Sequence, residues 1–355
     1  MAGYGVQGWE RELTNWLAPL LSALGHPARR LWAPFYIRGL LGPGERKSVQ
    51  PMAERLGLGG HDQLHNFIAS ASWNTNALEA VLAAKADALV GGAGAVLVVD
   101  DTALPKKGLH SVGVARQYAG ALGKNANNCQ TLVSLTLARD EVPIPVALRL
   151  FLPWEWVANP TRCAKAGIPA ALCAPKAKTD IALEEIDRLR AAGLRFGCVL
   201  ADAGYGISAG FRQGLDAREL LWAVGIPRIQ KVYRADAEMV RPAPLRGRPR
   251  RAAIPVEDAV AAETLLDAAP WRMISWRMGT KGPLAAECTW PMDRQSPSAA
   301  RPTGTCLGRQ FGWWGSAGRR VSGSTTCPTY PRTRTWRRSP APSRHAGCAS
   351  KGTSR

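Results

Sequence analysis

Two aspartates, Asp101 and Asp202, are the residues of this chain whose type and spacing favour chemistry. Each follows an apolar run: residues 96–99 precede Asp100 and Asp101, and residues 198–201 precede Asp202. Carboxylates at strand ends that meet in one sheet can hold two divalent metal ions, and such a site cuts and joins phosphodiesters. In this interpretation Asp101 bridges the two metals and Asp202 binds one of them.

The alternative interpretation is that each aspartate merely caps the turn after its strand, which is a common use of Asp. Spacing alone leaves both interpretations open, because the third carboxylate of such a metal site is not visible downstream. If the metal interpretation holds, hard oxygen ligands suit Mg²⁺, with Mn²⁺ as the substitute.

Composition bounds the class of protein. The chain has 355 residues, 46% of them apolar, which allows a sizeable core and roughly two domains. No apolar run approaches the roughly 18 residues that span a bilayer, and the first residues lack the features of a secretory signal. Eight cysteines without a C-x-x-C pair favour reduced thiols over a zinc site. We expect a soluble, cytoplasmic protein that does not bind membranes.

The formal net charge of +19 favours a polyanionic partner, because basic side chains that neutralise phosphates release counterions. The charge is unevenly distributed: no acidic residue follows Asp293, whereas twelve basic residues do. The rest of the chain is only mildly basic. Double-stranded DNA therefore suits the charge without being required by it.

Residues 1–90 predict a small helical domain. Apolar positions recur at helical spacing over 16–24 and 78–89, with glycine-rich breaks at 42–44 and 57–60. Basic pairs in its loops, Arg29-Arg30 and Arg46-Lys47, could contact DNA and make this a DNA-binding domain, although solvated loop charge is the favoured interpretation of these residues.

After residue 95 the pattern becomes that of strands. Residues 96–99 are typical of a buried central strand, and residues 129–138 and 144–152 predict a hairpin. A helix over 179–192 follows. Thr179 or Asp180 is its expected cap, and Gly193 ends it.

A strand at 196–201 then leads to Asp202, and a short helix near 209–218 precedes a strand at 220–224. The order strand, strand, strand, helix, strand, helix, strand predicts an α/β, ribonuclease-H-like mixed sheet. Its first and fourth strands are neighbours, which brings Asp101 and Asp202 to the same sheet edge. A doubly wound nucleotide fold is the alternative, but no glycine-rich phosphate-binding motif follows any strand.

The segments around both aspartates resemble insertion-sequence transposases of the DDE type, in particular the branch numbered seven hundred and one. The resemblance covers roughly residues 15–285. It is carried by PGERK at 43–47, PMA at 51–53, VDDT at 99–102, PKKG at 105–108, HSVGVARQY at 110–118, GALGK at 120–124, NCQ at 128–130 and LADAGYG at 200–206.

This resemblance implies a catalytic domain over residues 91–285 that binds transposon ends and target DNA at the nucleoid, with a homodimer on DNA as the candidate assembly. It implies Mg²⁺-dependent strand cleavage and transfer. In the family the aspartate before the threonine is catalytic, which selects Asp101 and leaves Asp100 as the second choice. Four basic residues are candidates for gripping phosphate, with a solvated face as the alternative: Lys106, Lys107, Arg116 and Lys124.

Other polar and aromatic residues near this edge have two interpretations each. Asn128 and Gln130 either orient a phosphate or close a turn. Trp154, Trp156 and Trp222 either stack on an extruded base or, as we favour, pack in the core.

The resemblance implies a third acid, a glutamate on a late helix that follows inserted sheet-like material, and no such glutamate is visible in the sequence. That material begins near residues 271–276, and the last glutamate, Glu287, precedes a stretch with no helical period. Residues 286–355 are too poor in aliphatic side chains to offset their ordering entropy, so we expect a disordered tail.

A change of reading frame would explain this break. Codons can be chosen for GWWGSAGRRVSGSTTCPTYP at 312–331 that spell WLVGERRASGERQYYLSNLP in the frame one nucleotide earlier, and this peptide resembles the family's own sequence. We predict a frame slip near Ala286 or Glu287. The product would be a truncated and impaired transposase; the alternatives are a non-catalytic DNA-binding inhibitor of transposition or an unrelated ribonuclease-H-like nuclease.

Sequencing the genomic locus tests the frame slip. We expect a single-base change near codon 286 to restore a family-like continuation that reaches a late helix with a glutamate. If no single-base change in that region does so, the frame slip is wrong.

Overall fold

The computed structural model describes residues 6–69, 74–119, 126–233, 237–241, 254–267, 271–279, 282–289 and 315–317. Most of the expected tail lies outside these residues. Within it, the structure describes residues 286–289 and 315–317, whose backbone lies in strands. Among the described residues, no helix combines the length and apolar content that crossing a membrane requires.

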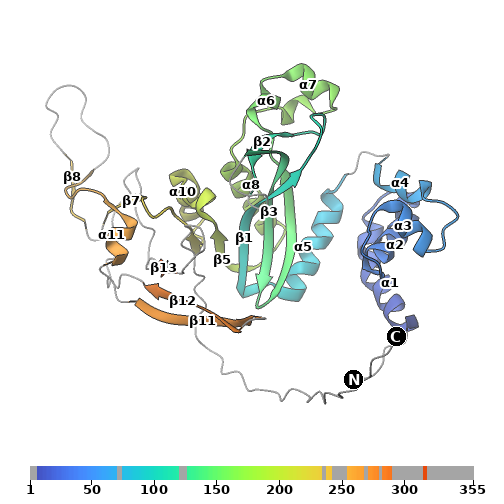
Figure 1. Cartoon of the computed structure of the whole chain (residues 1–355), viewed down its shortest axis with the longest axis horizontal. Coiled ribbons are helices and arrows are strands. Elements are labelled where there is room, and N and C mark those ends of the chain that lie inside the picture. Colours follow the sequence, from blue (N-terminus) through green and yellow to red (C-terminus); the bar gives the residue numbers. More distant parts are fainter. Residues whose placement is uncertain are drawn as a thin grey trace, which may run out of the picture.

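The N-terminal part is helical, as the sequence predicts. It contains α1 (Val6–Ser22), α2 (Pro27–Leu41), α3 (Val49–Arg55), α4 (Asp62–Ala69) and α5 (Asn76–Val90). Helices α1 to α4 cluster together, and α5 lies between that cluster and the main sheet (Figure 1). The α5 side chains Ala83, Ala86 and Val90 are buried in the same core as the strands. This helix therefore connects the two parts of the chain.

Six strands of the described residues form the main sheet. They are β1 (Gly92–Pro105), β2 (Ala115–Tyr118), β3 (Ala126–Arg139), β4 (Val142–Leu150), β5 (Phe196–Ala201) and β6 (Trp222–Val224). The order is β2-β3-β1-β5-β6, and β4 also pairs with β3. Strands β1, β3 and β4 are antiparallel, whereas β1, β5 and β6 are parallel. This is the predicted ribonuclease-H-like arrangement.

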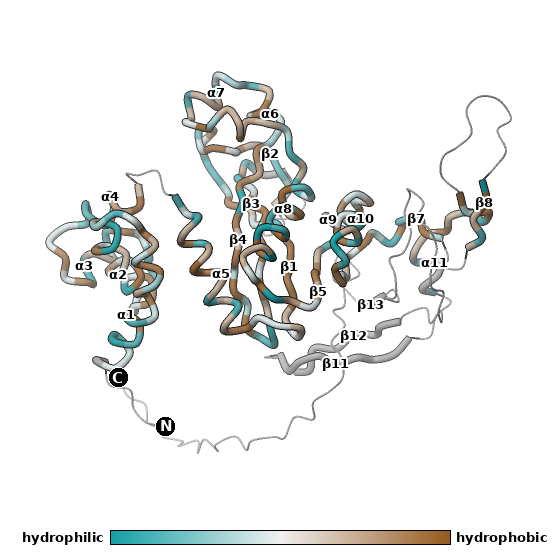
Figure 2. Tube along the Cα trace, turned by 180° about the vertical axis from the view of Figure 1, so that it is seen from behind, coloured by the Kyte–Doolittle hydropathy of each residue, from teal (hydrophilic) through white to brown (hydrophobic). Residues whose placement is uncertain are grey.

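The hairpin of β3 and β4 supplies much of the core. Thr131, Val133, Leu135 and Leu137 are fully buried on one face, as their alternation predicts. Hydrophobic stretches run along β1, β4 and α5 in Figure 2. Burial of these side chains is the main force that holds the strands in register.

Helix α8 (Lys178–Ala191) covers the core face of the sheet. Its side chains Ile181, Ile186 and Leu189 are buried, and Gly193 follows its end with φ 85°. The expected cap was wrong: the helix begins at Lys178, and its N-cap is Ala177, which makes no side-chain cap hydrogen bond. Thr179 and Asp180 therefore lie inside the first turn. This earlier start places Lys178 on the helix.

The remaining described elements are short. Around the main sheet lie α6 (Trp154–Val157), α7 (Pro160–Lys165), the 3₁₀ turn η2 (Ala170–Leu172), α9 (Ala203–Gly206) and α10 (Ala209–Ala217). After β6 come β7 (Lys231–Val232), β8 (Met239–Val240), β9 (Ile254–Pro255), β10 (Val260–Ala261), α11 (Ala262–Asp267), β11 (Trp271–Gly279), β12 (Gly282–Thr289) and β13 (Gly315–Ala317). Strand β11 begins at Trp271, within the segment where the sequence predicts the start of sheet-like material, but the two-residue strands β7 to β10 already precede it.

A charged network joins α5, β4 and α8 across the edge of the core. Arg149 Nε lies 2.7 Å from Glu185 Oε1, and Arg149 Nη2 lies 2.5 Å from Glu79 Oε2. Arg188 Nε also donates to Glu185 Oε2 at 2.8 Å. Burial acts to raise the pKa of Glu79, but the hydrogen bonds from Arg149 and Thr75, together with the positive charges of Arg149 and Arg188, outweigh it and lower that pKa.

We expect Arg149→Met to lower the free energy of unfolding by about 2 kcal/mol at neutral pH, because it leaves two largely buried carboxylates, Glu79 and Glu185, with Arg188 as their remaining shared partner. The folded pKa of Glu79 lies below its ordinary 4.5, so this contribution is present above pH 4.5 and lost as the pH falls through the folded pKa. Urea unfolding at several pH values measures both effects. Arg195→Met is the control.

Arg195 pairs with Asp87 but is 67% exposed, so its loss should cost less than about 1 kcal/mol. Equal losses in the two variants, or a loss in Arg149→Met that does not shrink in acid, would contradict the role assigned to the network.

Candidate active site

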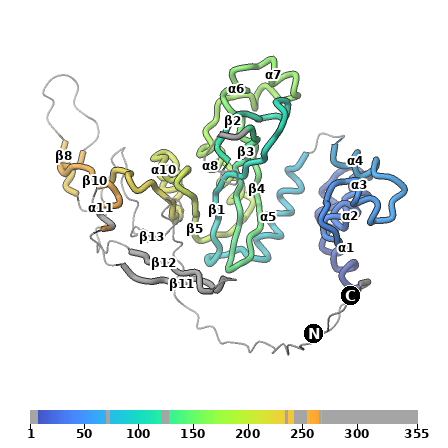
Figure 3. Tube along the Cα trace, in the orientation of Figure 1, coloured from blue at the N-terminus to red at the C-terminus, as the bar shows by residue number. Residues whose placement is uncertain are grey.

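The pairing of β1 with β5 brings the two predicted aspartates to one edge. The strands are parallel, with Val99 opposite Ala201 as the last pair. They lie side by side in Figure 3. Strand β5 ends at that point, whereas β1 continues through Asp101, which pairs with Val133 of β3. The next residue along each strand beyond the last pair is an aspartate, Asp100 on β1 and Asp202 after β5.

Asp101 lies on the face of β1 that carries Leu97 and Val99, because side chains alternate along a strand. Its carboxylate is held on both oxygens. Lys178 Nζ lies 2.5 Å from Oδ2, and the Tyr205 hydroxyl donates to Oδ1 at 2.7 Å. Asp101 therefore does not act as the cap of a turn: it stands within a strand, and its partners come from α8 and α9.

Asp202 is the N-cap of α9, as the alternative interpretation proposed. Its Oδ1 accepts hydrogen bonds from the backbone N–H groups of Gly204, at 2.9 Å, and Tyr205, at 3.3 Å. Within the described part of the chain its Oδ2 accepts none. The residue is exposed. One oxygen thus fixes the side chain, and the other is available to a ligand.

Asp100 is close enough to both aspartates to respond to their charges. Its partial removal from water raises its pKa, and the negative charges of Asp202 and Asp101 raise it further. The hydrogen bond that its Oδ1 accepts from the Asp101 N–H, at 2.7 Å, acts in the opposite direction. The three carboxylates therefore repel one another, which favours a cation at this edge.

Tyr205 and Lys178 are the residues of this site that sequence reasoning missed. Tyr205 is 3% exposed, and burial raises its pKa, as do the charges of Asp101 and Asp202. Its hydroxyl therefore stays protonated and donates to Asp101. A local signal for Tyr205 existed, since it lies in LADAGYG three residues after Asp202. None existed for Lys178, which is 77 residues from its partner.

Short helix α9 can approach the end of β6 closely because Gly206 has no side chain. A Cβ on Gly206 would overlap the backbone carbonyl of Gly225, which directly follows β6. Arg212 of α10 contacts the C-terminal end of α9, where its buried guanidinium donates a hydrogen bond to the Gly206 carbonyl. These contacts fix α9, and with it the positions of Asp202 and Tyr205.

The donor set is compatible with Mg²⁺. Two carboxylates offer hard oxygen atoms, and Mg²⁺ is commonly held by one or two carboxylates while it keeps several waters. Among the described residues, no group of three or more His, Cys, Asp or Glu side chains has the geometry of a metal site. Glu287 lies in strand β12, where its backbone pairs with Met273, rather than on a helix.

The basic candidates lie around the loop after β1. Lys107 and Arg116 are exposed and Lys106 is half-buried, so these side chains remain open to solvent or to DNA. Lys124 lies outside the described residues. Asn128 closes the loop, since its Nδ2 donates to the carbonyls of Lys106 and Gly108 at 2.8 and 2.9 Å.

Gln130 likewise ties the loop down, because its Nε2 donates to the Val112 carbonyl at 2.6 Å. The tryptophans differ from one another. Trp156 is buried, with its indole N–H donating to the Val114 carbonyl at 2.8 Å, as core packing predicts. Trp222 is half-buried and donates to Asp216, whereas Trp154 is 68% exposed.

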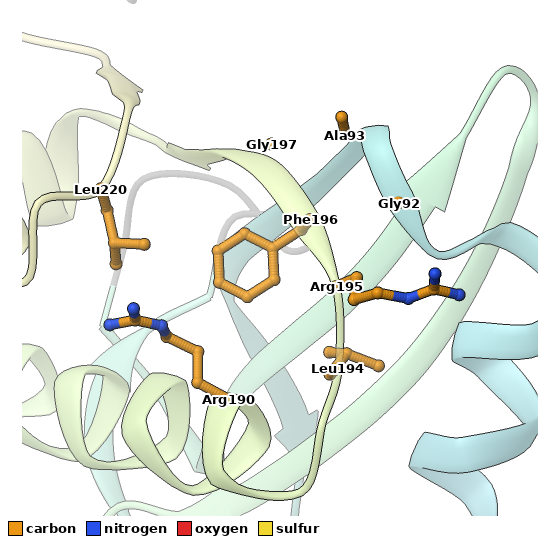
Figure 4. A pocket seen from close by; sticks show the side chains of 8 residues that line it. All are labelled: Gly92, Ala93, Arg190, Leu194, Arg195, Phe196, Gly197 and Leu220. Atoms are coloured by element: carbon orange, nitrogen blue, oxygen red, sulfur yellow. The ribbon is translucent and has the colours of Figure 1, made fainter.

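A pocket of about 440 Å³ lies at the opposite end of these strands (Figure 4). It is lined by Gly92, Ala93, Arg190, Leu194, Arg195, Phe196, Gly197 and Leu220. Residues 92 and 196 begin β1 and β5, whereas the aspartates lie where β5 ends. The pocket therefore takes no part in the carboxylate site.

Comparison with known proteins agrees with this arrangement. Residues 19–283 match the family described as DDE superfamily endonuclease. The chain belongs to this family. It is also 28% identical over 191 residues to a protein of Microchaete diplosiphon named "Probable transposase for insertion sequence element IS701", a match that covers 53% of this chain. The matched region spans 46% of that relative, or about half its length.

Among solved structures, the Drosophila P element transposase strand transfer complex shares 10% identity, with a TM-score of 0.27, over 62% of this chain and 43% of the other. A likeness of this size carries no weight in the argument below. The family membership rests on the sequence match.

We expect Tyr205→Phe to lower the free energy of unfolding by about 2 kcal/mol, because it removes a hydrogen bond to a charged carboxylate and leaves the ring in place. Chemical denaturation at neutral pH measures the loss. Tyr118→Phe is the matched control: Tyr118 is 64% exposed, and its change should stay within about 0.5 kcal/mol. Indistinguishable stabilities would show that the Tyr205 contact contributes nothing.

Proposed function

We propose that this protein descends from a transposase that cleaves and joins DNA strands at insertion-sequence ends, with Asp101 and Asp202 as its metal-binding carboxylates. The observation that carries the proposal is the meeting of these two residues where β5 ends beside β1. Family membership adds the expectation of endonuclease chemistry. The named relative supports an insertion-sequence transposase of the branch numbered seven hundred and one.

The residues of the chain have separate tasks in this proposal. Asp101 and Asp202 would hold Mg²⁺ or Mn²⁺, and the bound metal would activate the attacking oxygen and neutralise charge on the leaving oxygen. Tyr205 orients the Asp101 carboxylate through Oδ1, and the N–H groups of Gly204 and Tyr205 orient that of Asp202. Exposed Lys107 and Arg116 would contact DNA phosphates.

The proposed substrate is double-stranded DNA, both the transposon ends and the target, reached in the cytoplasm where the nucleoid lies. A homodimer on DNA is part of this proposal. The activity is proposed to be impaired, because the sequence after Ala286 changes composition and the frame-slip interpretation removes the late glutamate. The slip point falls inside β12.

Metal-dependent nicking of DNA that carries the transposon end tests the proposal. The wild-type protein should nick this DNA weakly in Mg²⁺ or Mn²⁺, and not in EDTA. Asp101→Asn and Asp202→Asn should each reduce nicking at least about a hundredfold, because each removes a metal ligand. Asp258→Asn, a change at an exposed aspartate remote in sequence from both, should have no effect.

Asp100→Asn decides between the adjacent aspartates. Retained nicking in this variant, together with loss in Asp101→Asn, supports Asp101 as the ligand. The reverse result would transfer the role to Asp100. Nicking that survives both Asp101→Asn and Asp202→Asn contradicts the proposed site.

A second function is favoured by one observation: within the described residues no third acidic side chain completes the metal site. A protein without that ligand would bind transposon ends without cutting them, and so inhibit the complete enzyme. In that case DNA binding persists in both aspartate variants, and no nicking occurs in any of them. Salt-dependent binding alone does not separate the two functions, because both predict it.

A further inference from the structure

The proposed metal chemistry gives no role to Lys178, although this residue contacts one of the two metal-binding carboxylates. It is the first residue of α8, and its ammonium lies 2.5 Å from Asp101 Oδ2. The same ammonium lies 5.2 Å from the centre of the Phe151 ring. The contact is partly shielded from water, since the side chains of Lys178 and Asp101 are 29% and 34% exposed. It therefore resembles neither a solvated surface charge nor a buried structural pair.

The contact uses the part of Asp101 that a metal would need. Oδ1 already accepts a hydrogen bond from Tyr205, and Oδ2 is in contact with the lysine. The tyrosine is neutral and can remain beside a bound cation. The ammonium carries a positive charge, and repulsion between it and a divalent cation on the same carboxylate is strong at such short range.

The Lys178 side chain can leave Asp101 without any movement of its own backbone. It lies on the first turn of α8, whose backbone is fixed by the buried Ile181, Ile186 and Leu189, while its own side chain is long and flexible. The Phe151 ring already lies 5.2 Å from the ammonium, so the side chain could keep this favourable contact while the ammonium leaves Oδ2. Movement of this one side chain would free Oδ2 without any change in the sheet.

We propose that Lys178 and a divalent cation compete for the Asp101 carboxylate. In the metal-free protein Lys178 is the counter-ion that offsets the electrostatic repulsion of Asp101 by Asp100 and Asp202. Binding of the metal displaces the lysine from Asp101. Lys178 is thus a positioning residue for the metal-free site, and it lowers the affinity of that site for metal. This inference rests on the proposed metal-binding role of Asp101.

Binding of Mn²⁺ to the full chain, followed by the electron paramagnetic resonance signal of the free ion, tests the competition without any catalytic activity. Lys178→Met keeps the length of the side chain and removes the charge. We expect it to bind Mn²⁺ about tenfold more tightly than the wild type. Lys178→Gln should behave in the same way, and Lys178→Arg should keep the weaker affinity.

Lys176→Met is the matched control. Lys176 pairs with Glu184 at 2.8 Å, close in sequence to Lys178, but that carboxylate is not part of the proposed site. Its loss should leave Mn²⁺ affinity unchanged. Thermal unfolding of each variant shows that the fold is kept.

The outcomes separate this inference from the proposed function. If Mn²⁺ binding is lost in Asp101→Asn but is equal in the wild type, Lys178→Met and Lys178→Gln, the metal site stands and the competition is wrong. If Lys178→Met binds more weakly, Lys178 assists the metal and the inference is also overturned. If neither the wild type nor Lys178→Met binds Mn²⁺ at a saturable site, the metal site fails and the competition fails with it.

Discussion

The parallel pairing of β1 with β5 is the constraint on which the rest of the structure depends. Residues that lie about a hundred positions apart become neighbours because Leu97 and Val99 are buried beside Val199 and Ala201. A shift of one residue would turn these side chains out of the core, so hydrophobic burial fixes the register. The same register brings Asp101 and Asp202 to one edge, where β1 continues and β5 stops. The order of the core thus determines the geometry of the site.

Two helices convert that register into a defined arrangement of charges. Helix α8 is held by its buried aliphatic face and by the network of Arg149 with Glu79 and Glu185, and its first residue therefore reaches Asp101. Helix α9 is held by close glycine packing against the residue after β6, and its tyrosine reaches the same carboxylate from the other side. Burial, and then the negative charges of Asp202 and Asp101, raise the pKa of Asp100, and Lys178 supplies a positive charge to the same group of carboxylates through its contact with Asp101.

The fold was largely predictable from the sequence, because the signals for it are local. Three local patterns of apolar residues each indicate which side chains are buried: the alternation over residues 129–138, the continuous run at 96–99 and the helical spacing before Gly193. The contacts of the site were less predictable. Lys178 and Arg149 act over long sequence separations, and the start of α8 differed from the expected cap because Ala177 occupies that place without a side-chain hydrogen bond. The placement of Asp101 and Asp202 at the same sheet edge followed from strand order, whereas the contacts of Lys178 and Tyr205 with Asp101 join residues far apart in the sequence.

Cleavage of the polypeptide by bound iron measures most directly whether Asp101 and Asp202 form one divalent-metal site. Fe²⁺ in place of Mg²⁺, with ascorbate and peroxide, generates hydroxyl radicals that cut the backbone beside the ligands. A shared site predicts fragments that end near residues 101 and 202, both suppressed by excess Mg²⁺ and absent in Asp202→Asn. Cleavage at only one of these segments, or cleavage that Mg²⁺ does not suppress, would contradict a shared site.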